Sequence, residues 1–140
     1  MQSLRLRFEG VVVESLPENQ CRVTIHCSHG DQRFSATREG HAVGDAPIGL
    51  AATATLEIVE VFTEQLLKCS LEEFERTQAF GKDLIVLLVR VEHNESRVQL
   101  FGSYRTRGPE SDCLAAGSRA ALDATNRFVE LVQRQLHPEA

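Results

Sequence analysis

Apolar and polar residues alternate strictly from Cys21 to Ser28, which is the period of a β-strand with one buried face. The stretch Leu4 to Glu14 is rich in Val and Phe and predicts an earlier strand, and Pro17-Glu18-Asn19 is a turn cluster between the two. His29-Gly30-Asp31 predicts a tight hairpin turn, after which Gln32 to Arg38 returns as a third strand. The expected inward positions of the middle strand are Cys21, Val23, Ile25 and Cys27.

Two longer segments carry apolar residues at helical spacing. The first begins after Asp45, a candidate N-cap, with Pro47 in the first turn, where a missing N–H matters little. Its apolar face is Ile48, Ala51, Thr55, Ile58, Phe62 and Leu66. The second begins at the candidate N-cap Ser111, with Asp112 favourable to the helix dipole, and runs to about Leu136. Its apolar face is Leu114, Gly117, Ala121, Ala124, Phe128 and Val132.

The segment between these helices repeats the first half of the chain. Phe74 to Phe80 is a weaker first strand, Leu84 to Val91 is a strong second strand, and Arg97 to Arg105 is the third, after the turn Asn94-Glu95-Ser96. A shift of 66 positions, which pairs Phe8 with Phe74, aligns the apolar positions of both halves without a gap.

The repeat predicts an α+β fold of duplicated βββα units, with six mostly antiparallel strands carrying two helices on one face. One such unit has too little core to fold alone. We therefore expect residues 1–140 to form a single domain built from two repeats, about 4–67 and 70–133.

One stretch resembles a known family. Part of the second predicted helix is the run Asp112-Cys113-Leu114-Ala115-Ala116-Gly117-Ser118-Arg119-Ala120-Ala121-Leu122-Asp123-Ala124-Thr125-Asn126. This run is similar to the last helix of the C-terminal regulatory domain of 2-isopropylmalate synthases. The segment before it, Arg97 to Gly108, resembles the strand and glycine turn that precede that helix. The resemblance implies two βββα units, dimerisation and binding of a feedback amino acid. Because 140 residues cannot hold the catalytic barrel of a synthase, we expect a stand-alone relative of the regulatory fold without acyl-transfer activity.

Composition narrows the function classes. The chain has 140 residues with a net charge of −5, which argues against general nucleic-acid binding. It has no Trp and one Tyr, so stacking platforms for bases are scarce. The first eight residues lack the apolar block of a secretory signal, and no run of about eighteen apolar residues could span a membrane. We expect a cytoplasmic protein with reduced thiols, no cofactor and no metal, because the four cysteines show no paired spacing.

The glycines around the two predicted helix starts mark the best candidate ligand region. Free N–H groups at helix N-termini can bind an anion or a carboxylate. The alternative is that these residues serve only turns and caps. The candidate residues are Gly40, Gly44, Asp45, Gly108, Ser111, Asp112 and Gly117.

Three other clusters contain residue types that could bind a metal, catalyse a reaction or bind nucleic acid, but a structural role is favoured for each. Metal ligands could come from His26, Cys27, His29 and His41, although Cys27 is expected inside and His29 in a turn. A nucleophile and base could come from His93, Glu95 and Cys113, although packing is the usual role of a free cysteine. A nucleic-acid surface could come from Arg5, Arg7, Arg22, Arg33 and Arg38, although interleaved acids favour a salt-bridged, solvated face.

The two halves differ where their strands otherwise align. Val86 and Leu88 occupy the face of their strand opposite Ile85 and Leu87, and Phe101 adds to that outer face. Strands that are apolar on both faces are normally buried on both sides. We therefore predict a homodimer through Val86, Leu88 and Phe101, with the amino-terminal strand or the loop near residue 71 as the alternative cover.

The function predicted from the sequence is a non-catalytic dimerising domain that binds a small ligand, such as an amino acid, or a partner protein in a regulatory role. A small enzyme with a site formed between subunits and an RNA-binding module are the alternatives.

Overall fold

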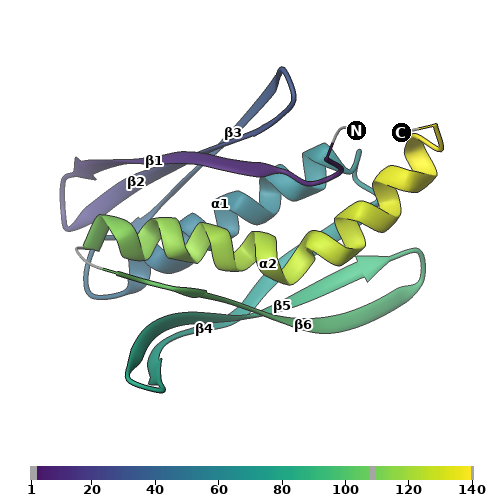
Figure 1. Cartoon of the computed structure of the whole chain (residues 1–140). Coiled ribbons are helices and arrows are strands. Elements are labelled where there is room, and N and C mark those ends of the chain that lie inside the picture. The colour runs from purple at the N-terminus through teal and green to yellow at the C-terminus, as the bar shows by residue number, and fades with distance from the viewer. Residues whose placement is uncertain (1–2, 108–109, 140) are drawn as a thin grey trace.

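The computed structural model describes residues 3–107 and 110–139. Each half of the chain contributes three strands followed by a helix (Figure 1). The first half comprises β1 (Arg7–Leu16), β2 (Gln20–His29), β3 (Gln32–His41) and α1 (Ala46–Phe62). The second half comprises β4 (Leu67–Ala79), β5 (Lys82–His93), β6 (Ser96–Arg105) and α2 (Glu110–Leu136).

The strands form two separate antiparallel sheets with the same strand order, β1-β2-β3 and β4-β5-β6. Figure 1 shows the two helices as a middle layer between the β1–β3 sheet and the β4–β6 sheet. Each sheet therefore has one face covered by helix and one outer face. The predicted α+β class with duplicated βββα units is confirmed, and the helices cover one face of each sheet.

The core lies on the inner faces of the middle strands. Every second residue of β2 from Cys21 to Cys27 is buried, as its alternation predicts, and the same holds for β5 from Ile85 to Val91. These two rows pack against the helices, and the buried residues of both halves belong to one continuous cluster. At about 25 cal/mol per Å² of apolar area, this shared core is the main source of stability.

Small residues let the helices approach one another and the β4–β6 sheet closely. A side chain at Gly117 would lie 3.0 Å from Ile48 Cγ2 on α1, and the buried hydroxyls of Thr55 and Ser118 are 2.7 Å apart across the same contact. Near the other end, the Gln133 side-chain amide donates to the Phe62 carbonyl at 2.9 Å. The two helices therefore run in the same general direction.

The exact register of the repeat changes along the chain. The turns that begin at Gly30 and Asn94 are 64 residues apart (94 − 30), and both residues have positive φ. The buried helix positions Ile48 and Leu114 are 66 apart (114 − 48), as predicted. The second unit thus has two more residues than the first between its last turn and the buried face of its helix.

Some predicted details of the helix ends are wrong. Asp45 precedes α1, but its side chain makes no capping hydrogen bond. Ser111 lies inside α2, which begins at Glu110, so it does not precede the helix. Leu66 lies beyond the end of α1 and is 41% exposed, so it is not on the buried face. The predicted site residue Gly108 lies outside the described residues.

Candidate functional site

The outer face of the β4–β6 sheet carries an apolar patch, formed by Leu84, Val86 and Leu88 on β5 and Phe101 on β6. The antiparallel register pairs Leu88 with Phe101, so the two side chains are neighbours on one face. Phe101 is 75% exposed, although aromatic side chains are among the largest contributors to core burial. Of the predicted interface residues, the structure thus leaves Phe101 largely exposed within one chain, and Val86 and Leu88 half-buried.

A shallow hollow of about 160 Å³ lies within this apolar patch. Val86, Leu88 and Phe101 line it together with the inner-face residues Phe74 and Leu87. Two glutamates of β4, Glu73 and Glu75, also line the hollow. An exposed aromatic ring beside an apolar hollow is a combination suited to insertion into a second surface.

Charged residues flank the apolar patch on both neighbouring strands. The register pairs Glu73 with Leu88 and Glu75 with Val86 on the β4 side, and Arg105 with Leu84 on the β6 side. Among the side chains that the structure describes, neither these two glutamates nor Arg105 forms an ion pair or hydrogen bond. At the other end of the same face, Glu92 pairs with Arg97 at 3.0 Å, and Glu72 accepts a hydrogen bond from Gln99 at 3.0 Å.

The outer face of the β1–β3 sheet has the opposite character. Thr24 and Thr37 share a hydrogen bond of 2.9 Å there, and Arg22 pairs with Glu14 at 2.9 Å and with Glu39 at 3.0 Å. Arg7 of the predicted arginine set also pairs with a carboxylate on this strand face. Arg38 lies on the inner face and pairs with α1, and Arg5 precedes β1 and pairs with α2. The positive charge of this face is therefore largely balanced locally, as its interleaved acids predict.

A second exposed aromatic residue lies at the tip of the β4–β5 hairpin. Phe80 is fully exposed and has a φ of 54°, a left-handed conformation that bulky residues rarely adopt. It precedes Gly81 in a two-residue turn where Asn or Asp is the usual choice. The tip lies at the same end of the sheet as Leu84, so Phe80 and Phe101 both belong to the apolar end of the β4–β6 sheet.

The starts of the two helices meet at a small hollow of about 130 Å³. Gly44 and Asp45 line it from the α1 side, and Cys113 and Leu114 line it from α2. Among the described residues of the lining, Arg76 of β4 contributes a cation, 3.8 Å from the Asp45 carboxylate. The structure therefore places two predicted ligand residues, the sequence neighbours Gly44 and Asp45, at this hollow and adds a basic group to them.

Three other predicted ligand residues, Gly40, Asp112 and Gly117, serve packing or loop geometry. A side chain at Gly40 would lie 2.9 Å from Leu50, and Gly117 is in the contact between the helices. The Asp112 carboxylate accepts hydrogen bonds from the Arg107 backbone N–H and the Thr106 hydroxyl, and these bonds hold the pKa of Asp112 below its usual value. Its charge is thus used to hold the loop before α2.

The candidate metal ligands point in different directions. Alternation along β2 puts His26 on the outer face and Cys27 in the core. His41 approaches Gln20, with 3.1 Å between the two nitrogens, and the His29 imidazole is 2.6 Å from the Ser3 carbonyl oxygen. Across residues 3–107 and 110–139, no three His, Cys, Asp or Glu side chains converge in a way that could hold a metal ion.

The candidate nucleophile and base are also far apart. The His93 ring packs edge-on against Phe128 at 6.5 Å, whereas Cys113 lies 15 residues earlier in α2 (128 − 113), which is about 22 Å along a helix. All four cysteines are free thiols. Burial, with nearby Glu9 and Glu60 adding to it, raises the pKa of Cys27 and Cys69 to about 12, so both are protonated at neutral pH.

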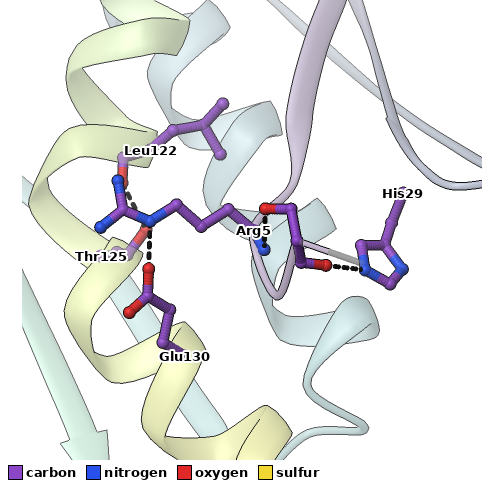
Figure 2. A network of polar contacts seen from close by, with 6 residues as sticks. Arg5, His29, Leu122, Thr125 and Glu130 are labelled. Carbon is purple, nitrogen blue, oxygen red and sulfur yellow. Dashed lines mark hydrogen bonds and ion pairs between the residues drawn. The ribbon is translucent and has the colours of Figure 1, made fainter. Parts of the chain in front are cut away.

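A larger hollow of about 610 Å³ lies at the opposite end of the helices. Ser3, Leu4 and His29 are among the residues that line it. Figure 2 shows the polar contacts of the amino-terminal segment, in which Arg5 pairs with Glu130 of α2 and the Ser3 carbonyl oxygen contacts the His29 imidazole. The His29 ring also packs on Phe62, with centroids 5.0 Å apart. These contacts tie the segment before β1 to the rest of the chain.

Sequence reasoning missed the groups that surround the predicted sites. Glu73, Glu75 and Arg105 flank the apolar patch, and Arg76 lines the hollow at the helix starts. The sequence does show a contrast that could have indicated the charged flanks of the patch: the segment before β5 is rich in acidic residues and the segment after it is basic.

No protein-family model and no curated protein matches the chain. None of the helices in the described part of the chain is long and apolar enough to cross a membrane.

Proposed function

We propose that this chain is a non-catalytic homodimerising domain, related to the regulatory domain of 2-isopropylmalate synthases, whose dimer forms through the apolar patch of the β4–β6 sheet. The observation that carries the proposal is the contrast between two sheets of the same topology. One outer face is mainly polar and internally paired, with Val12 as an exposed apolar residue, whereas the other exposes Phe101 beside a hollow. The layout of two βββα units is also what the resemblance implies.

The exposed aromatic ring supplies a large part of the driving force. A Phe side chain buries roughly 200 Å², so covering the exposed three quarters of Phe101 (75%) removes about 150 Å² of apolar area per copy. At 25 cal/mol per Å², this gives roughly 4 kcal/mol per copy as an upper limit. A twofold contact uses the patch twice, which is enough to offset part of the entropy lost on association.

The state of the thiols supports a role without catalysis. Catalytic cysteines need a lowered pKa and access to solvent, whereas burial raises the pKa of Cys27 and Cys69. Cys113 is buried, and its sulfur lies 3.6 Å from the Thr106 hydroxyl. None of these thiols is poised for attack on a substrate.

The hollow between the helix starts supports a second element of the proposal, binding of a small carboxylate such as an amino acid. The Arg76 guanidinium and the two helix N-termini would attract the carboxylate. A thermal-shift titration with amino acids tests this element. We expect a stabilisation that Arg76→Gln abolishes; no shift with any amino acid would refute ligand binding while leaving dimerisation intact.

Sedimentation velocity of two charge-matched variants tests the dimer. Phe101→Lys should raise the dissociation constant at least about a hundredfold, because it places a charge in the contact and removes the ring. Ser35→Lys, on the exposed outer face of the other sheet, should leave dimerisation unchanged. Equal association of both variants and the wild type would refute the proposed interface.

A further inference from the structure

We infer that two copies of the chain associate about a twofold axis that runs along β5, so that β4 of one copy lies over β6 of the other. The inference rests on the dimer proposed above and adds the relative orientation of its two copies. It follows from the distribution of charge on the outer face of the β4–β6 sheet.

The two edge strands of this face carry opposite charges. On the β4 side, Glu73 and Glu75 lie beside the apolar patch and Glu72 lies at a bulge next to them. On the β6 side, the register places Arg97 and Arg105 on the same outer face, with no acidic residue on that strand. Beside the apolar patch, the middle strand thus separates an acidic stretch of β4 from the basic β6. Lys68 of β4 and the ion pair of Arg90 with Glu92 on β5 lie on the same face but away from the patch.

Among the described residues, the charged side chains are paired at one end of this outer face and unpaired at the other. Away from the apolar patch, Arg97 already pairs with Glu92, and Glu72 is held by Gln99. Beside the patch, the described side chains of Glu73, Glu75 and Arg105 are left without a charged partner. The unpaired charges therefore coincide with the exposed apolar residues, which is the arrangement of a hydrophobic contact with a charged rim.

Two sheets that stack face to face by twofold symmetry have two simple arrangements. An axis across the strands places β4 over β4 of the partner copy, so that acidic residues face acidic residues in two copies that already carry −5 each. An axis along β5 places the acidic strand over the basic one, twice. Stacked sheets lie about 10 Å apart, a gap that Glu and Arg side chains can bridge.

The register identifies the pair that should meet. Glu75 and Ser103 flank Val86, and in the next row towards the β4–β5 hairpin Arg105 flanks Leu84. With the axis along β5, Glu75 of one copy lies over Ser103 of the partner copy and one row from its Arg105. Long side chains reach such diagonal neighbours. Symmetry provides this contact twice in each dimer.

Charge reversal measured by sedimentation equilibrium tests the orientation. Arg105→Glu and Glu75→Arg should each weaken the dimer about tenfold, because each makes two like-charge contacts, and the combined variant should return to within about threefold of the wild type. Arg33→Glu is the matched control, since it makes the same charge change on the outer face of the other sheet and should have no effect.

Neutralisation distinguishes the two axes. Glu75→Gln should weaken the dimer if β4 lies over β6, and should tighten it if β4 lies over β4 of the partner copy. A tighter Glu75→Gln dimer, or a combined variant no better than either single one, would overturn the inferred orientation while the dimer itself stands. A wild-type chain that stays monomeric, or that binds only a different protein through this face, would overturn the proposed dimer and this inference with it.

Discussion

The closest backbone approach between sheet and helix predicts a severe effect for Gly102→Ala. A β-carbon at Gly102 would lie 2.0 Å from the Ala120 carbonyl oxygen, 2.7 Å from Ala124 Cβ and 2.8 Å from the Ala124 backbone nitrogen. Favourable contacts between carbon atoms lie at about 3.5–4.0 Å, so β6 and α2 must separate by more than about 1 Å. Two of these three atoms belong to the helix backbone, which cannot move aside by changing a rotamer.

Overpacking a core costs about 1–3 kcal/mol when side chains can adjust, and a contact with backbone belongs at or above the top of that range. We expect Gly102→Ala to lower the free energy of unfolding by about 3–5 kcal/mol, which is a large fraction of the stability of a typical domain. Urea unfolding followed by far-ultraviolet circular dichroism measures it, at one fixed protein concentration so that association does not contribute.

Gly10→Ala is the matched control in the other sheet. A β-carbon there meets no atom within 4 Å, so the substitution should be neutral or stabilise the chain by up to about 1 kcal/mol. If the free energy of unfolding of Gly102→Ala is within about 0.5 kcal/mol of the wild-type value, β6 and α2 do not lie as close together as described.

Three further substitutions follow from packing, protonation and cation–π contact. Ala124→Glu should lower the free energy of unfolding by several kcal/mol, because position 124 is 6% exposed and the carboxylate would be buried. Asp123→Lys should lower it by about 1 kcal/mol, because one hydrogen bond to β6 is lost. Equal midpoints in denaturant titrations would contradict this difference. The free energy of unfolding should fall as pH rises from about 9 to 12. The thiols of the unfolded chain ionise in this range, whereas Cys27 and Cys69, with a folded-state pKa of about 12, stay protonated. Cys69→Ala should make this decrease smaller in unfolding curves measured at alkaline pH. Arg119→Gln should lower the free energy of unfolding by about 1–2 kcal/mol, because the guanidinium lies over two aromatic rings at 4.8 and 5.3 Å. An unchanged midpoint in urea would contradict that role.

The strands that the sequence predicted best are those with unbroken alternation. β2 and β5 lie at the centre of their sheets, and their inward residues were identifiable because the side-chain period of a strand is two. β4 was predicted to begin at Phe74 but begins at Leu67. The register shifts between Leu71 and Glu73, so the inward positions change parity at the bulge and the pattern is interrupted.

Periodicity identified which residues face inward but not how the two units are placed. The pattern could not show that six strands divide into two sheets, because alternation is the same in either arrangement. Helix faces were more informative, since Gly117 belongs to the predicted apolar face and lies in the contact with α1. The side chain at Asp45 was misjudged because its cap position does not ensure a capping bond.

The candidate interface was predictable in part. The apolar residues Val86, Leu88 and Phe101 differ from their counterparts in the first half, and this difference is visible in the sequence. The flanking pair Glu75 and Arg105 was not recognisable, because it depends on the register of three strands, and the bulge in β4 changes which glutamates face outward.

Sedimentation equilibrium of the wild-type chain at micromolar concentration tests the proposed dimer most directly. The chain has a mass of 15.6 kDa, and its apolar outer face has no cover within the described residues. The proposal predicts a mass of twice 15.6 kDa that decreases towards 15.6 kDa on dilution. A mass of 15.6 kDa at every concentration up to about 100 μM would contradict it, because a face of this character should be at least half-covered there.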